Sequence, residues 1–249
     1  MGREKLFSKR TIHAYILVVA VIFIFAIVAF LMLRYHVEGE KNMPFEIQEM
    51  DVISTAAGSN TKDDAGIWYS DLSQKNDIYF YIGKNENYKK EAMIKSITFD
   101  NFQINKYNKT GTAQIYRPSG DDTYNYTDDY IVKDSLIYSG GRSTDEQQFI
   151  INNQGGVVGF SILTSDIGKY QINDDETISV DGTLLKKAGI TSDDIKMDVS
   201  FDITIETESG DKFKASDTIN LPSGNILDEG VSTEKITDLS HLVFKRGRI

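Results

Sequence analysis

A run of 20 uncharged residues, Ala14 to Leu33, limits what this chain can fold into more than any other feature. As a helix rising about 1.5 Å per residue, such a run spans the roughly 30 Å hydrocarbon core of a bilayer. A buried helix of a soluble domain usually keeps a polar face, but here only Tyr15 is amphipathic. We therefore predict a transmembrane helix over residues 12–34.

Charges flanking this run predict its orientation. Four basic residues precede it, Arg3, Lys5, Lys9 and Arg10, opposed only by Glu4. Mixed charges follow it, so the positive-inside rule places the N-terminus in the cytoplasm and the remainder outside a cell membrane crossed once. The run exceeds a typical signal-peptide core and lacks a small-x-small cleavage site, so we expect a retained signal anchor rather than a cleaved signal peptide. The predicted division is a cytoplasmic tail (1–11), the helix (12–34), a juxtamembrane linker (35–44) and an extracytoplasmic region (45–249).

Composition excludes several function classes for the outer region. The first 40 residues carry five basic and three acidic side chains, which leaves 22 basic and 34 acidic residues beyond them, a net charge of −12. Such a surface repels nucleic acid, so we expect no nucleic-acid partner. The chain has no cysteine, which excludes disulfide scaffolds, thiolate catalysis and iron–sulfur clusters.

The outer region is predicted to be mainly β. Alternating apolar and polar residues are clearest in Met197 to Ile205, and Ser209 to Asp211 then turn the chain into Lys212 to Ala215 as a hairpin. Further strands are expected at Phe45–Ile53, Asp77–Ile82, Ile94–Ile104, Thr112–Tyr116, Tyr130–Tyr138, Gln148–Ile151 and Gly156–Leu163. Many short strands at regular spacing predict an antiparallel β-sandwich.

One helical segment is expected in this region, Thr183 to Ala188, with Gly189 as its C-cap. About 205 outer residues exceed a single immunoglobulin-sized domain of about 100 residues. We favour one elaborated sandwich over two small ones, with a subdivision near residues 166–181 as the alternative.

Catalytic motifs are sparse. His13 and His36 flank the membrane helix and His241 stands alone, so a histidine-based triad and a histidine zinc site are not expected. Paired carboxylates could still hydrolyse glycosides. Such clefts tend to display aromatic platforms, and the only tryptophan is Trp68.

No cofactor is predicted. The nearest approach to a Ca²⁺ loop is Asn173 to Glu176 with Asp181 and Gly182, which lacks the EF-hand spacing and is equally explained as a solvated acidic loop. The glycines of Gly155 to Gly159 lack the lysine of a phosphate loop and are interpreted as a bend entering a strand.

A tyrosine-rich segment is the candidate partner-binding loop. Its tyrosines are Tyr116, Tyr124, Tyr126 and Tyr130. Tyrosine is a low-entropy contact residue that is common in binding loops, so these side chains could form a recognition surface. The alternative is a hairpin loop whose tyrosines pack back on the sheet.

The short basic tail, the single span, the run from Ile151 to Phe160 and the closing segment from Leu221 to Arg246 resemble an uncharacterised family of membrane-anchored exported proteins of Gram-positive bacteria. The resemblance implies the membrane topology and a bacterial surface setting, and it assigns a role to no residue. The last residues, Phe244 to Ile249, are basic and are expected to dock on the domain's own carboxylates, to face the membrane or to be solvated.

Two functions follow from these observations. The first is a non-catalytic, membrane-anchored envelope protein that presents its sandwich for protein binding or for support of a membrane complex. The alternative is an extracytoplasmic hydrolase that acts on cell-wall glycan or peptide through carboxylates.

Overall fold

The computed structural model describes residues 9–120, 123–141, 149–173 and 178–247. The chain divides into two units, Met1–Lys41 and Asn42–Ile249. The first unit consists of helix α1 (Lys9–Glu38), of which Ile12–Glu38 is long and apolar enough to cross a membrane. This helix covers the predicted span.

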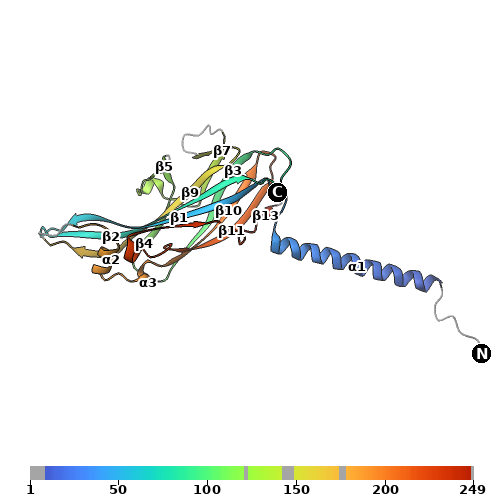
Figure 1. Ribbon diagram of the computed structural model, residues 1–249, viewed down its shortest axis with the longest axis horizontal. Helices are drawn as coiled ribbons and strands as arrows, with labels where there is room; N and C mark the ends of the chain where they lie inside the picture. The colour runs from blue at the N-terminus through green and yellow to red at the C-terminus, as the bar shows by residue number, and fades with distance from the viewer. Residues whose placement is uncertain (1–8, 121–122, 142–148, 174–177, 248–249) are drawn as a thin grey trace, which may run out of the picture. The chain divides into compact units, whose positions relative to one another are not determined.

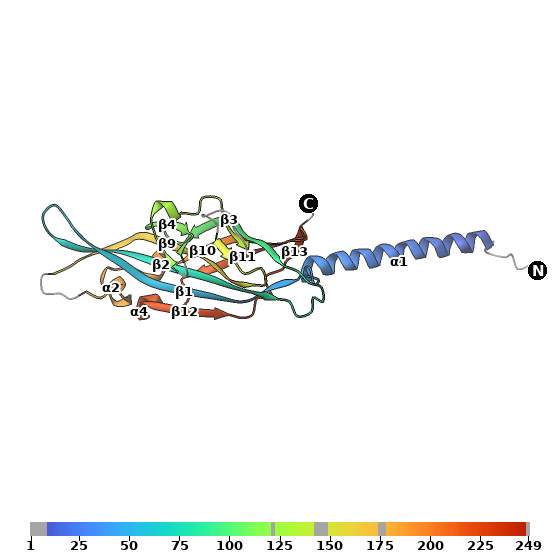
Figure 2. The same ribbon diagram turned by 90° about the horizontal axis from the view of Figure 1, so that it is seen from above.

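The second unit is built on two large sheets (Figures 1 and 2). Sheet A has five strands in the order β12 (Val231–Ile236), β1 (Phe45–Lys62), β2 (Trp68–Lys84), β9 (Gly156–Gln171) and β4 (Thr112–Tyr116). Sheet B has six strands in the order β13 (Lys245–Gly247), β11 (Lys212–Leu221), β10 (Met197–Thr207), β3 (Ile94–Lys106), β7 (Ser135–Gly140) and β8 (Phe149–Ile151). Neighbours within these sheets are antiparallel except the parallel pair β7 and β8. The predicted fold class, mainly β with an antiparallel sandwich after an apolar helix, is confirmed.

Shorter elements complete the unit. They are the small hairpin β5 (Pro118–Gly120) and β6 (Thr123–Tyr124), the 3-10 turn η1 (Asp128–Tyr130), and the helices α2 (Gly182–Lys187), α3 (Ser192–Ile195) and α4 (Ile226–Glu229). The expected helix at Thr183 to Ala188 is therefore α2, and Gly189 follows it with φ +76° as the C-cap prediction requires.

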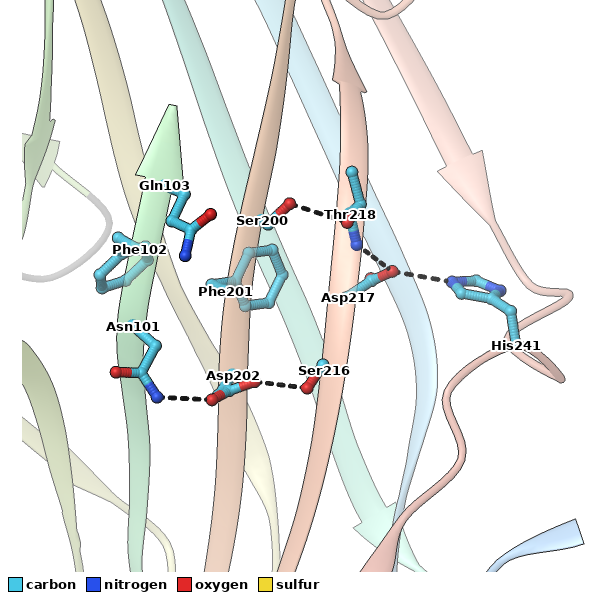
Figure 3. A pocket seen from close by; sticks show the side chains of 10 residues that line it. All are labelled: Asn101, Phe102, Gln103, Ser200, Phe201, Asp202, Ser216, Asp217, Thr218 and His241. Carbon is cyan, nitrogen blue, oxygen red and sulfur yellow. Dashed lines mark hydrogen bonds and ion pairs between the residues drawn. The ribbon is translucent and has the colours of Figure 1, made fainter. Parts of the chain in front are cut away.

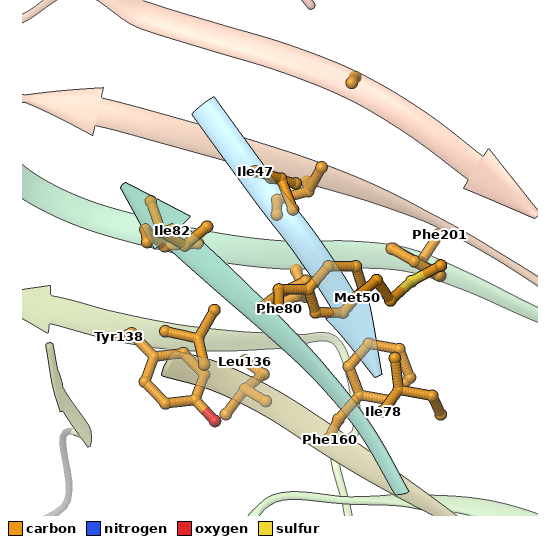
Figure 4. Close-up of a cluster of buried hydrophobic side chains, with 14 of the residues drawn as sticks. Ile47, Met50, Ile78, Phe80, Ile82, Leu136, Tyr138, Phe160 and Phe201 are labelled. Carbon is orange, nitrogen blue, oxygen red and sulfur yellow. The ribbon is translucent and has the colours of Figure 1, made fainter. Parts of the chain in front are cut away.

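The main core lies between the two sheets (Figure 4). Phe80 and Phe160 come from sheet A, Phe99 and Phe201 come from sheet B, and all four side chains are buried. Ring centroids lie 5.1 Å apart for Phe80 and Phe99 and 5.3 Å apart for Phe160 and Phe201, across the sheets. Tilted and edge-to-face aromatic contacts at these distances join the layers into one core.

A second, smaller core lies under the helices. Leu184 and Leu185 of α2 pack with Leu72 of β2 and Ile226 of α4. Gly182 allows this packing, since a Cβ there would lie 2.5 Å from the carbonyl oxygen of Leu227. The helices thus cover a part of sheet A that lies outside the main core between the two sheets.

Buried polar side chains occupy the inner face of sheet A, where alternation would place apolar residues. Ser54, Ser70, Gln74 and Asn76 are fully buried. The Ser54 hydroxyl donates to Asn76 Oδ1 at 2.7 Å, and Gln74 Nε2 donates to the same oxygen at 3.2 Å. These two bonds join Ser54 and Gln74 to Asn76, whereas Ser70 Oγ, Gln74 Oε1 and Asn76 Nδ2 are buried without a hydrogen-bond partner among the described residues.

Two predictions about elements need correction. Tyr130 to Tyr138 does not form one strand: Tyr130 ends η1, and β7 begins only at Ser135. The intervening chain makes only an isolated bridge between Ile131 and Tyr116. Strands β1, β2 and β9 also extend well beyond the predicted Phe45–Ile53, Asp77–Ile82 and Gly156–Leu163.

The glycine bend was predicted correctly. Gly155 has φ +126°, and a Cβ there would lie 2.4 Å from the carbonyl oxygen of Ile82. Only glycine fits this close approach, and β9 starts at the next residue.

Candidate functional site

A groove of about 710 Å³ runs over the outer face of sheet B (Figure 3). Its floor is formed by neighbouring positions on β3, β10 and β11, and His241 lies at its rim. The floor residues with outward polar side chains are Asn101, Gln103, Ser200, Asp202, Ser216 and Thr218. Short hydroxyl, amide and carboxylate groups on strands give this surface a dense set of donors and acceptors.

A β-bulge in β3 brings two of these residues onto the groove. Ser200 pairs with Gln103 while Asp202 pairs with Asp100, so one residue of β10 faces two residues of β3. Asn101 lies at the bulge with φ +54°, a conformation that asparagine tolerates better than most residues. The bulge shifts the alternation of β3 by one residue. Asn101 and Gln103 therefore both point outward.

Asp202 is the centre of a hydrogen-bonded group on the floor. Its Oδ2 accepts from Asn101 Nδ2 at 2.6 Å and lies 2.8 Å from Lys214 Nζ, and Ser216 donates to its Oδ1. Burial by itself would raise the pKa of Asp202, but these three donors outweigh that effect and lower the pKa below its usual value. The carboxylate is thus held as an ion, which suits recognition and does not suit proton donation.

The rest of the floor is also prearranged. The hydroxyls of Ser200 and Thr218 lie 2.9 Å apart on adjacent strands. The Gln103 side chain makes no hydrogen bond to any other residue drawn in Figure 3, so its amide is available to a ligand. Because the strands fix these groups, a ligand pays little to order them.

A smaller cavity of about 200 Å³ adjoins the groove at Asp217, Thr218 and His241. It lies between β11 of sheet B and the β1 and β12 side of sheet A. The Asp217 side chain is only 3% exposed, and its Oδ1 lies 3.2 Å from Nε2 of the half-exposed His241. His241 is therefore a partner of a buried carboxylate, although it looked isolated in the sequence.

The tyrosine-rich segment lies against the outer face of sheet A. Tyr116 is 3% exposed, while Tyr124, Tyr126 and Tyr130 are partly buried. The rings of Tyr116 and Tyr126 meet edge to face at 5.1 Å. These tyrosine side chains therefore pack back on the sheet, and the buried Tyr116 is not exposed to a partner. Residues 121–122 of this segment lie outside the described residues. Partner binding by the exposed parts of the loop stays a prediction.

Under this segment lies a carboxylate with a perturbed pKa. Asp77 Oδ1 accepts from the hydroxyls of Ser161 at 2.5 Å and Tyr126 at 3.3 Å. Burial raises the pKa of Asp77 despite these hydrogen bonds. Asp77 lines neither the groove nor the adjoining cavity.

Other predicted candidates are dispersed. Trp68 is 48% exposed at the start of β2 and lies in neither cavity, and His13 and His36 belong to α1. Of the proposed Ca²⁺ loop, residues 174–176 lie outside the described residues, and Asp181 serves as the N-cap of α2. Among the described residues, no group of three or more histidines and carboxylates is placed to hold a metal ion.

The groove residues were not singled out from the sequence, although signals for two of them exist. In β3 the apolar residues Ile97 and Phe99 are two apart, whereas Phe99 and Phe102 are three apart, which marks the bulge at Asn101. In β11 the inward positions are apolar except at Asp217, so its carboxylate breaks the alternation. Asp202 gives no such signal, because an outward aspartate on a strand is ordinary.

Compared with protein-family models, curated proteins and solved structures, the chain gives no match in any of the three. The resemblance to exported proteins of Gram-positive bacteria therefore remains a prediction.

Proposed function

We propose that this chain is a membrane-tethered, non-catalytic binding protein of the cell envelope. Its sandwich holds a partner protein on the outer face of β3, β10 and β11, outside the membrane. The single observation that carries this proposal is the prearranged polar floor of the groove of about 710 Å³. Protein interfaces use such fixed donors and acceptors to orient a partner at little entropic cost.

The state of the carboxylates favours binding over hydrolysis. A glycosidase needs one carboxyl group with a raised pKa to act as an acid beside a second, ionised carboxyl group. In the groove the pKa of Asp202 is lowered, and the raised one belongs to Asp77, which lies beneath Tyr126 on the other sheet. Asp77, the carboxyl group with the raised pKa, and the groove are thus on different faces of the sandwich.

Copurification from the native membrane tests the proposal. The full-length tagged protein is crosslinked in cells beside two variants, Thr218→Arg in the groove and Thr233→Arg on β12, both at exposed strand threonines. We expect one stoichiometric partner with the unaltered protein and with Thr233→Arg, and at least a tenfold loss with Thr218→Arg. Equal recovery with both variants, or recovery of bulk membrane protein alone, would contradict the proposal. So would hydrolysis of wall substrates that a single carboxylate substitution abolishes.

A further inference from the structure

The smaller cavity lies at an open side of the sandwich. Strand β13 pairs only with Lys212 to Lys214 of β11, so the part of β11 from Asp217 onward has no β13 residue beside it. The chain between β12 and β13 passes here and places His241 at the cavity. A side chain that enters from the groove therefore meets the edge of β11.

Apolar side chains line this cavity together with polar and acidic ones. Met50 and Val52 of β1, Ile219 of β11 and Ile236 of β12 line it. Asp217 contributes its carboxylate, and the exposed Glu234 adds a second acidic group. Apolar side chains beside a buried carboxylate match an alkyl chain with a cationic end.

Asp217 has one oxygen in use and one without a partner. Its Oδ1 accepts from the backbone N–H of Thr218 at 2.8 Å and lies 3.2 Å from His241 Nε2. Its Oδ2 is buried and has no hydrogen-bond partner among the described residues. A buried carboxylate oxygen without a donor costs free energy, which a ligand that brings a donor recovers.

Nearby cations and donors are engaged elsewhere. Lys235 pairs with Glu49 at 2.7 Å, and Lys214 pairs with Asp202 at 2.8 Å. The hydroxyl of Ser223, which also lines the cavity, donates to the carbonyl oxygen of Val52 at 3.1 Å. None of these three groups reaches Asp217 Oδ2.

We infer that this cavity is a binding site for an alkylammonium group, specifically the lysine side chain of the protein held in the groove. The inference rests on the proposed function for the identity of the ligand, because the cavity opens at the groove's rim. Methylenes of the lysine contact Met50, Val52 and Ile219, and the ammonium donates to Asp217 Oδ2. A charge-assisted bond of this kind gives about a tenfold or greater preference over an uncharged side chain of equal length.

Methyl NMR on the full-length protein in lipid nanodiscs tests the site with a small probe. The probe is Nα-acetyl-lysine methylamide, and its uncharged counterpart is Nα-acetyl-norleucine methylamide. We expect saturable shifts of the Met50 and Ile219 methyl signals with the lysine probe, no shift of the exposed Ile137, and binding of the norleucine probe weaker by at least tenfold. Equal binding of both probes, or no saturable shift, overturns the inference.

Two variants sharpen the test. Asp217→Asn keeps the acceptor Oδ1 but removes the charge, so it should lose the preference for lysine. Asp71→Asn is the matched control, a strand carboxylate on sheet A that is hydrogen-bonded to Thr61 at 2.6 Å and lies in neither cavity. It should keep the preference. The comparison of the two probes uses the unaltered protein, so it tests the inference even if the variant Asp217→Asn does not fold.

The outcome is separable from that of the proposed function. The titration needs no partner protein, so failed copurification leaves it unchanged. Conversely, a captured partner together with equal binding of the two probes would show that the groove recognises its ligand without a lysine anchor.

Discussion

Two aspartates on opposite sheets illustrate how neighbours set the ionisation of a residue. Asp77 of β2 is mostly buried under Tyr126, whereas Asp202 of β10 is contacted by Lys214 and Asn101. Burial raises the pKa of Asp77, whereas donors overcome burial and lower the pKa of Asp202. Each pKa shift makes the free energy of unfolding depend on pH, and the two dependences have opposite signs.

Asp77→Asn should stabilise the protein at neutral pH and leave it unchanged in acid. An unfolded aspartate has a pKa of about 3.9, and the folded pKa is higher, so the folded state binds the proton more tightly. Stability from this group is therefore fully present below about pH 4 and is lost as the pH rises through the folded pKa. Asparagine keeps the acceptor for Ser161 and Tyr126 without ionising. Thermal unfolding of the full-length protein in detergent, followed by near-ultraviolet circular dichroism, should show a higher Tm for the variant at pH 7.5 and equal values near pH 4.

Asp202→Asn is the control, because its effect on stability should depend on pH in the opposite direction. Its lowered pKa means that stability is present above about pH 4 and is lost as the pH falls through the folded value. This variant should have a lower Tm than the unaltered protein at pH 7.5, and the difference should shrink in acid. A difference that does not depend on pH in Asp77→Asn would show that packing, not ionisation, dominates at that site.

At the scale of elements, hydrophobic alternation predicted where strands start better than where they end. The strand β4 was predicted with its observed bounds, Thr112–Tyr116, and the hairpin of β10 and β11 was also predicted. Strand β2 was expected only from Asp77 because the inward positions before it are polar. In the folded protein those positions, Gln74 and Asn76, bond to each other at 3.2 Å. Asn76 Oδ1 also accepts from Ser54 of the neighbouring strand β1, and this cross-strand contact has no signature in the local sequence.

The helix α2 depends on its N-cap. Asp181 Oδ1 accepts from the backbone N–H groups of Thr183 at 2.9 Å and Leu184 at 3.3 Å. Asp181→Ala should lower the free energy of unfolding by about 1 kcal/mol, the usual cost of a lost cap, because α2 holds part of the second core. Urea unfolding followed by circular dichroism measures this change.

Matched variants separate the cap from the charge. Asp181→Asn also caps helices and should stay close to the unaltered protein. Asp193→Ala removes an exposed carboxylate of α3 whose nearest cation, Lys196, is 4.0 Å away, and should change stability by less than about 0.5 kcal/mol. A loss in Asp181→Asn equal to that in Asp181→Ala would assign the effect to the negative charge.

At the scale of the whole molecule, the apolar helix and the sandwich are separate units. The two hydrophobic clusters lie within the second unit, Asn42–Ile249, and include no residue of the helix. The basic end of the chain is part of that unit, since β13 pairs with β11 and Arg246 forms an ion pair with Asp211. Of the three outcomes expected for this end, docking on the domain's own carboxylates is the one seen for Arg246.

Cysteine labelling tests the predicted orientation of the chain. Because the sequence has no cysteine, single substitutions give unambiguous sites. We expect a membrane-impermeant maleimide to label Ser59→Cys, at an exposed position of β1, on intact cells. Lys5→Cys should react only after permeabilisation, because positive charge is retained on the cytoplasmic side. The reverse pattern would overturn the orientation, and protection of both sites would overturn an outer location of the sandwich.

The sequence by itself determined the apolar helix and the β class of the rest, because both depend on patterns within a few consecutive residues. It also indicated the bend at Gly155 and the helix before Gly189, where backbone geometry demands glycine. Only the tertiary structure decided the site. The groove joins Asn101, Asp202 and Thr218 from three strands, and the cavity joins Met50 to Asp217 and His241. These residues come from separate strands and loops, and strand pairing and sheet packing alone bring their side chains together.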